Sequence, residues 1–324
     1  MGCGFNSVVK LVKNFAGIFP GQGSQYVGMA RDLYDAYLHI KEFYKKADDV
    51  LGYGLSRVCF EGPEKTLTET KYTQPAIFVH SLALWNLMSE RKKIRPSFVA
   101  GHSLGEYSAL VVAGVFSFED GLFAVKQRAS LMQEACDRNK GTMAAIIGLS
   151  REDVLEICKE ASSKGIIQPA NFNSEEQIAI SGEMEAVEFG VELAQRKGAK
   201  RAMLLQVGGA FHSPLMNSAR EGMSEVLSKV EINPARIPVV SNVTARVMTQ
   251  PQEIKDALVE QITKPVLWYD SMQYVYQQGV RDFVEIGPGK VLQGIIKRSF
   301  NDASNFGVDK SVDLDKFLEL LEIA

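Results

Sequence analysis

The chain has 324 residues, of which 46% are hydrophobic and 23% charged, and its formal net charge is −3. This composition is that of an average globular protein and excludes the class of disordered chains with few apolar and many charged residues. No long run of one charge appears, so a basic surface for nucleic acid is not expected. At this length a large domain with a smaller inserted or appended one is the expected organisation.

Neither a membrane span nor an export signal is visible. The longest nearly apolar stretch, residues 107–118, is far shorter than the roughly 20 residues that cross a bilayer. Residues 1–17 contain no continuous apolar segment and no small-residue cleavage site. The four cysteines lack CxxC spacing. We therefore expect a cytoplasmic protein with reduced thiols and no membrane attachment.

Strands and helices alternate in the first part of the chain. Residues 14–19 predict a strand, and the loop PGQGSQ that follows contains proline and glycines that stop it. Apolar residues at helical spacing predict one helix over residues 33–51. A second helix is expected from Pro75 to about Met88, followed by a short buried strand over 97–100.

The pattern changes twice in the rest of the chain. A helix is expected after Ser117, because Ser117 and Asp120 have the spacing of an N-cap and its N3 partner. Residues 141–207 then follow the order strand, helix, two strands, helix, strand, which is the ferredoxin-like order. After that segment, apolar strands at 237–243 and 283–287 alternate with helices, as in parallel α/β architecture.

These patterns predict an α/β fold with two domains. The large domain, residues 14–136 and 208–324, is expected to be hydrolase-like, with a parallel sheet and a G-x-S-x-G elbow. The small ferredoxin-like domain, residues 137–207, is inserted into it. Residues 1–13 are interpreted as an N-terminal extension outside the catalytic part.

The sequence GHSLG, residues 101–105, fits the G-x-S-x-G pattern. In such an elbow the two glycines allow a serine to occupy a tight strand-to-helix turn with its hydroxyl exposed. A predicted strand precedes the motif and a helical segment follows it. Ser103 is therefore the candidate nucleophile, and a purely structural turn is the alternative.

A serine hydroxyl needs a base, and histidine is the usual one because its pKa lies near neutrality. His39 lies off the apolar face of its predicted helix, and His80 lies inside an apolar helix. His102 adjoins Ser103, but side chains on either side of a tight turn diverge. By elimination the candidate base is His212, in a glycine- and proline-containing loop of the kind that often presents catalytic groups; a structural loop histidine is the alternative.

The remaining groups of the site are less determined. Asp120, Asp137 and Asp153 lie between the serine and the histidine without a distinguishing setting, and a backbone carbonyl could equally hold the imidazole. Attack on a thioester also requires two donors for the oxyanion. The backbone N–H of Leu104 follows from the elbow, and the loop around Gln22 is suited to bring the second, with a simple turn as the alternative.

Seven motifs occur in the order FPGQGSQ, GHSLGEYSAL, QRASLMQEA, GAFHSPLM, SNV, LVEQ and EIGPGKVL. Together they resemble the successive motifs of bacterial malonyl-CoA:acyl carrier protein transacylases, of the acyltransferase family of fatty-acid and polyketide synthesis. The resemblance covers about residues 14–300 and includes the position of the inserted domain. It implies a dyad of Ser103 and His212, with the imidazole held by the main-chain carbonyl of Gln261 and with Gln22 and Leu104 as oxyanion donors.

The resemblance also implies substrate contacts. Arg128 would receive the malonyl carboxylate as a bidentate pair, although an arginine at a helix edge is otherwise usually a surface residue. Met132 would line the same wall, and Phe211 would crowd an α-methyl branch. Asn171 and Asn242 match asparagines near the substrate cleft, with a turn or a buried hydrogen bond as the alternative role for both.

The implied function is transfer of malonyl from malonyl-CoA to the phosphopantetheine thiol of acyl carrier protein, through an ester on Ser103, in fatty-acid synthesis. The expected partners are the carrier protein and the coenzyme A thioester, the expected state is a monomer, and no metal or bound cofactor is expected. A serine hydrolase or thioesterase using water, and a non-catalytic acyl-binding scaffold, are the alternatives.

Overall fold

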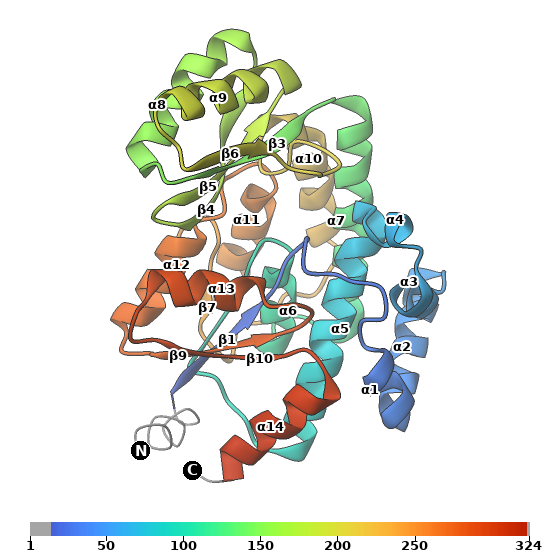
Figure 1. Cartoon of the computed structure of the whole chain (residues 1–324). Coiled ribbons are helices and arrows are strands. Elements are labelled where there is room, and N and C mark those ends of the chain that lie inside the picture. The colour runs from blue at the N-terminus through green and yellow to red at the C-terminus, as the bar shows by residue number, and fades with distance from the viewer. Residues whose placement is uncertain (1–13, 323–324) are drawn as a thin grey trace.

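The computed structural model describes residues 14–322, so the predicted N-terminal extension lies outside the described residues. Figure 1 shows an α/β fold in which a larger sheet lies below a smaller one, with helices around both. No helix of the described residues is long and apolar enough to cross a bilayer.

The larger sheet has six strands in the order β10-β9-β1-β2-β7-β8. Its neighbours are parallel except for the final pair, β7 with β8, so the sheet is mixed. The strand predicted over residues 237–243 shrinks to two residues. The strands are β1 (Phe15–Phe19), β2 (Phe98–Gly101), β7 (Val239–Val240), β8 (Val247–Met248), β9 (Asp282–Ile286) and β10 (Ser304–Val308).

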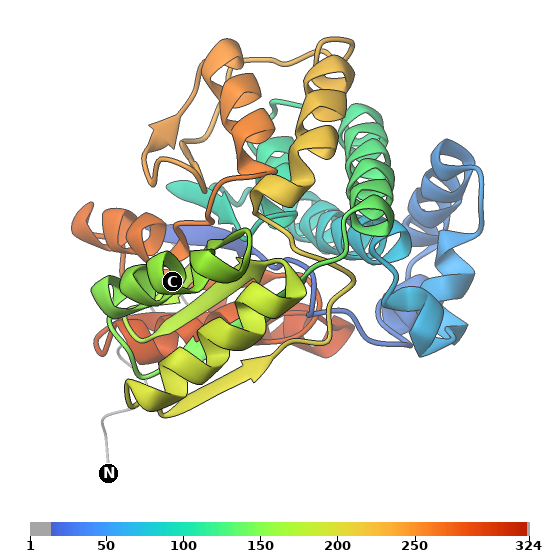
Figure 2. The ribbon, with the colours of Figure 1, turned by 90° about the horizontal axis from the view of Figure 1, so that it is seen from above.

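The smaller sheet is antiparallel throughout, in the order β4-β5-β3-β6. Helices α8 and α9 cover its outward face, as Figures 1 and 2 show. Ser150 and Asp153 form a complete capping box at the start of α8. The elements are β3 (Thr142–Ile147), α8 (Arg151–Ala161), β4 (Ile167–Ser174), β5 (Gln177–Gly182), α9 (Met184–Arg196) and β6 (Arg201–Leu204).

Some of the other helices, such as α6 and α13, pack on strands of the larger sheet, and others, such as α2 and α10, pack on neighbouring helices. Ser117 caps α7 by accepting a hydrogen bond from the Asp120 N–H. The helices are α1 (Arg31–Ala36), α2 (Leu38–Leu51), α3 (Leu55–Glu61), α4 (Glu64–Leu67), α5 (Thr70–Arg91), α6 (Gly105–Val112), α7 (Phe118–Arg138), α10 (Asn217–Leu227), α11 (Pro251–Gln261), α12 (Trp268–Gln277), α13 (Val291–Ser299) and α14 (Ser311–Glu322).

Two helices differ from the sequence prediction. The single helix expected over 33–51 is divided at Tyr37, whose backbone is extended at φ −125° and ψ 118°. Helix α5 begins at Thr70, ahead of Pro75, which lies inside it. Proline cannot donate to the carbonyl of Lys71, but that carbonyl accepts a hydrogen bond from the Tyr53 hydroxyl at 3.3 Å. The helix therefore tolerates the proline.

Strand β4 also pairs with a segment outside the smaller sheet. The Phe172 N–H donates to the Val266 carbonyl at 2.9 Å, and the Val266 N–H donates to the Ala170 carbonyl at 2.8 Å. This short ladder fixes the smaller sheet to the segment that follows α11. The space between the sheets holds the candidate site.

Candidate active site

Ser103 lies in the turn between β2 and α6, with a left-handed φ of 50°. The two glycines of the motif allow the strand and helix to meet there. A Cβ on Gly101 would lie 1.8 Å from the carbonyl carbon of Gly105, and a Cβ on Gly105 would lie 2.1 Å from the Phe19 oxygen. The spacing of the motif is therefore required by close backbone packing on both sides of the serine.

Two buried polar side chains hold this turn from behind. Asn242 accepts from the Ser103 N–H at 2.7 Å and donates to the Gly101 carbonyl at 2.7 Å. Its own N–H donates to Glu106 Oε1 at 2.9 Å. Asn242, for which a place near the substrate and a buried hydrogen bond were the two predicted roles, is completely buried beneath the turn. Burial raises the pKa of the Glu106 carboxyl to about 7.

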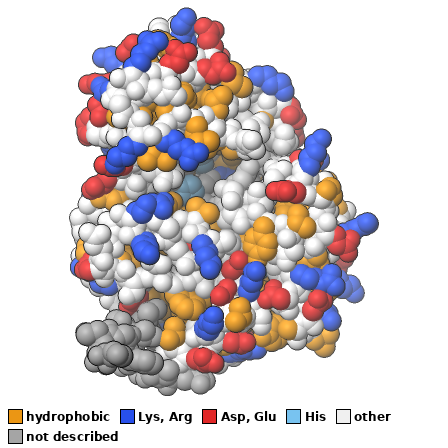
Figure 3. Space-filling view, in the orientation of Figure 1, with side chains coloured by type: hydrophobic (Ala, Val, Ile, Leu, Met, Phe, Trp, Pro, Cys, Tyr) orange, Lys and Arg blue, Asp and Glu red, His pale blue; other side chains and the backbone are white. Residues whose placement is uncertain are grey.

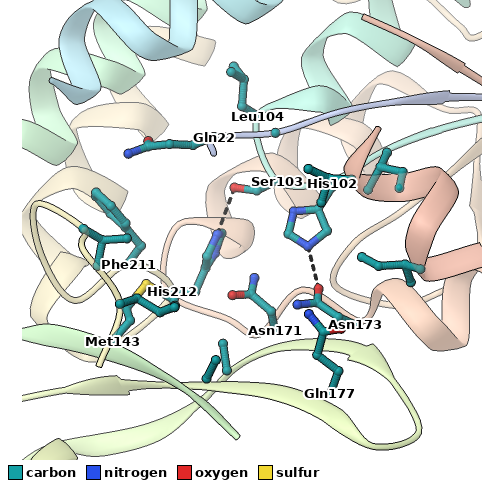
Figure 4. A pocket seen from close by; sticks show the side chains of 18 of the residues that line it. Gln22, His102, Ser103, Leu104, Met143, Asn171, Asn173, Gln177, Phe211 and His212 are labelled. Carbon is teal, nitrogen blue, oxygen red and sulfur yellow. Dashed lines mark hydrogen bonds between the residues drawn. The ribbon is translucent and has the colours of Figure 1, made fainter. Parts of the chain in front are cut away.

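His212 faces the serine from a loop, as Figure 4 shows, and its Nε2 lies 2.9 Å from Ser103 Oγ. Its Nδ1 lies 2.8 Å from the main-chain carbonyl oxygen of Gln261. A carbonyl only accepts hydrogen bonds, so Nδ1 carries the proton and Nε2 is free to accept the hydroxyl proton. The partner that the sequence left open is thus a backbone carbonyl rather than a carboxylate.

The imidazole is neutral at physiological pH. Burial, and secondly the positive charge of Arg128, lower the pKa of His212 to about 3. A neutral imidazole that accepts from a serine hydroxyl can take its proton when that oxygen attacks a carbonyl carbon. Two of the other histidines have partners of their own: His80 is buried against Asp309, and His102 Nε2 lies 2.8 Å from Asn173 Oδ1.

Arg128 lies on α7 and is only 1% exposed, so it is not a surface arginine. Its Nη1 donates to Gln74 Oε1 at 2.6 Å, and its Nη2 donates to Ser103 Oγ at 3.0 Å and to Gln261 Oε1 at 2.9 Å. These acceptors are neutral, and among the described residues Nε has no acceptor. Burial lowers the pKa of the guanidinium. The site therefore contains a buried cation that an anionic ligand would stabilise.

The serine, the histidine and the arginine line one cavity of about 240 Å³ between the two sheets. Figure 3 shows the hollow, with a histidine visible inside it and Lys and Arg side chains beside it. Of the other predicted site residues, Gln22, Leu104, Met132, Asn171 and Phe211 line the cavity, whereas Gln261 contributes from behind the histidine and the arginine.

Three residues with evident roles in this geometry were missed by the sequence analysis. Gln74 accepts a hydrogen bond from Arg128 and donates one to Met132 Sδ at 3.6 Å. In the sequence it is a polar residue before Pro75, and nothing there distinguishes it from other polar residues. Glu106 could have been found from the sequence, because a carboxylate at the start of an apolar run is an unusual feature that indicates a buried polar role. Gln168, which contacts the loop of His212, had no such feature.

A serine hydroxyl that is hydrogen-bonded to a neutral imidazole is the pair that forms acyl-serine esters, and here it lies beside a buried cation in an α/β fold. The family model described as the acyl transferase domain matches residues 17–315. The chain belongs to this family. Among the described residues, no group of three or more His, Cys, Asp or Glu side chains could hold a metal ion.

The relatives are more particular. The chain is 44% identical over 288 residues to the malonyl CoA-acyl carrier protein transacylase of Bacillus subtilis (strain 168), covering 89% of this chain and 90% of that one. It is 41% identical over 306 residues to the enzyme of the same name from Escherichia coli (strain K12), covering 94% and 99%.

Solved structures agree in fold with this chain. A malonyl-transacylase in complex with its type II PKS acyl-carrier protein has a TM-score of 0.92 and 42% identity, covering 95% of this chain and 99% of that one. The malonyl-CoA:acyl carrier protein transacylase of Xanthomonas oryzae pv. oryzae has a TM-score of 0.91 and 40% identity, covering 94% and 97%.

Proposed function

We propose that the protein transfers the malonyl group of malonyl-CoA to the phosphopantetheine thiol of acyl carrier protein and thereby supplies fatty-acid synthesis. The observation that carries the proposal is the buried guanidinium of Arg128, which lies within hydrogen-bond distance of the Ser103 hydroxyl. The names of the relatives and the acyl-carrier-protein complex of one structural neighbour support the same reaction. The Lys and Arg side chains beside the hollow suit the anionic groups of coenzyme A.

In the first half-reaction, Ser103 Oγ attacks the thioester carbonyl while His212 Nε2 takes its proton. The backbone N–H groups of Leu104 and Gln22 stabilise the oxyanion of the tetrahedral intermediate, and each such donor is worth about 10²–10³ in rate. The C–S bond then breaks, and coenzyme A leaves with the proton from His212. A malonyl ester remains on Ser103.

The second half-reaction is the reverse with another thiol. The phosphopantetheine thiol gives its proton to His212 and attacks the ester carbonyl. The C–O bond to Ser103 breaks, and Oγ recovers its proton from His212. One thioester replaces another, so the chain's own residues and the two thioesters suffice, with no bound cofactor in the proposed steps.

Selectivity for malonyl follows from the pairing of its carboxylate with Arg128. The carboxylate supplies the negative charge that the neutral acceptors around the guanidinium lack. Met132, Asn171 and Phe211 also line the cavity, which supports the proposal that the Phe211 ring crowds an α-methyl branch.

The same proposal includes the architecture around the site. We interpret the larger sheet and its helices, residues 14–136 and 208–324, as a hydrolase-like domain with a nucleophile elbow at Ser103. The strand order of the smaller sheet supports a ferredoxin-like insertion over residues 137–207. Three cysteines are buried and free of disulfides, which supports a location of the protein in the reducing cytoplasm: Cys59, Cys136 and Cys158.

Intact-protein mass spectrometry after brief exposure to malonyl-CoA tests the function. The wild type and the control Ser130→Ala, which removes an exposed hydroxyl on α7, should gain one malonyl group and lose it to added holo acyl carrier protein. Ser103→Ala should gain none. Steady release of coenzyme A without carrier protein would instead indicate a hydrolase. Absence of a malonyl adduct on the wild type would favour the non-catalytic acyl-binding scaffold.

A further inference from the structure

Gln168 connects the smaller sheet to the loop of His212. It lies on β4 and is partly buried, outside the residues that line the cavity. Its side-chain Nε2 donates to the main-chain carbonyl of His212 at 2.7 Å and to the main-chain carbonyl of Thr263 at 2.9 Å. Both N–H groups of the amide are used, and because both neighbours are acceptors only this orientation of the amide fits.

The two carbonyls belong to the two segments that set the imidazole geometry. His212 has a left-handed φ of 56°, a conformation that non-glycine residues adopt only where their surroundings hold them. Thr263 follows two residues after Gln261, whose carbonyl accepts from His212 Nδ1 at 2.8 Å. One amide therefore ties the backbone that carries the base to the backbone that orients it.

We infer that Gln168 is a positioning residue for His212, through which the smaller sheet holds the base at its distance from Ser103. The inference rests on the proposed function and deepens it. The ladder between β4 and Val266 anchors the strand beside this amide, so the sheet offers a fixed point rather than a mobile one. Displacement of a catalytic group by about 1 Å can reduce a rate about a hundredfold.

The test uses Gln168→Met, which keeps the length of the side chain and removes both donors. The matched control is Gln195→Met, which removes a glutamine amide that donates to another carbonyl of the smaller sheet, that of Ala202. Rapid-quench measurement of malonyl-ester formation over a range of malonyl-CoA concentrations separates the rate of acylation from the affinity for substrate. In Gln168→Met the rate should fall about tenfold to a hundredfold, with half-saturation changed less than about twofold.

A spectroscopic readout distinguishes positioning from general loosening. In the protein labelled with ¹⁵N-histidine, the Nδ1 proton of His212 should move upfield and exchange faster in Gln168→Met, and stay unchanged in Gln195→Met. Should Gln168→Met unfold, Gln168→Glu is the second variant, since its carboxylate has the same shape and no donor when ionised.

The failure of the inference and the failure of the proposed function look different. Full malonylation of the wild type that is absent in Ser103→Ala supports the function whatever Gln168 does. Acylation of a folded Gln168 variant at the wild-type rate, or a loss that appears only in half-saturation, overturns the positioning role. No malonyl ester on the wild type overturns the function itself.

Discussion

Replacement of Arg128 by methionine removes the charge of the guanidinium and keeps much of the apolar stem. A malonyl carboxylate would then lie buried without its cation, which costs about 3–5 kcal/mol. At about 1.4 kcal/mol for each factor of ten, kcat/KM for malonyl-CoA should fall about a hundredfold to several-thousandfold. Acetyl-CoA has no carboxylate to pair with Arg128, and the acceptors that Arg128 has among the described residues are neutral. The preference for malonyl over acetyl should fall by the same factor.

The assay is competition between equal concentrations of the two thioesters, with the adducts on Ser103 counted by intact mass and checked by transfer to carrier protein. Lys126→Met is the matched control, because it removes a cation from the same helix, and the Lys126 ammonium donates to the Val50 carbonyl at 3.4 Å. Arg128→Lys should lie between, since it keeps the charge without the planar fork. A malonyl preference in folded Arg128→Met within threefold of the wild type would refute the reasoning.

Three further predictions concern pH, packing and thiols. Because burial holds the pKa of His212 at about 3, the acylation rate should lack the roughly thirtyfold loss from pH 7.5 to pH 5 that an ordinary histidine of pKa about 6.5 would cause. A stopped-flow pH profile measures it, and the same profile of Glu106→Gln separates any titration of the Glu106 carboxyl, whose pKa is about 7. Gly105→Ala should lower the free energy of unfolding in urea by about 3 kcal/mol or more, because its Cβ would lie 2.1 Å from a backbone oxygen. Gly54→Ala should lower it far less, because its Cβ would lie 3.9 Å from the Arg57 Cβ, an ordinary contact distance. Burial raises the pKa of Cys136 to about 11 and of Cys158 to about 12, so iodoacetamide at pH 8 should label both only after unfolding, as peptide mass spectrometry would register.

The turn at Ser103 was predictable because the residues that it requires form one short motif. A Cβ at Gly101 would strike the backbone of Gly105, and a Cβ at Gly105 would strike the backbone of Phe19, so both positions require glycine and the sequence shows both. The partner of His212 was not predictable from its own surroundings. It is a main-chain carbonyl of Gln261, and every residue in the chain has such a group. Only the resemblance to a family selected one of them.

Other differences arise from contacts distant in sequence. The sequence predicted one helix because apolar residues keep helical spacing on both sides of Tyr37. A single extended residue between α1 and α2 does not interrupt that pattern in the sequence. Pro75 lies inside a helix since a hydroxyl from another element, that of Tyr53, satisfies the free carbonyl. Asn242 could face the cleft or the back of the turn, and the sequence around it would be the same.

Both proposed catalytic residues, Ser103 and His212, have a left-handed backbone that only two other described non-glycine residues share. Such a conformation costs on the order of 1–3 kcal/mol for each residue. Ser103→Gly would relieve this strain and abolish the chemistry, so selection for heat resistance alone would not preserve the nucleophile. Selection for a more stable form of this enzyme therefore needs a turnover step in every round, because stability and activity oppose each other at Ser103.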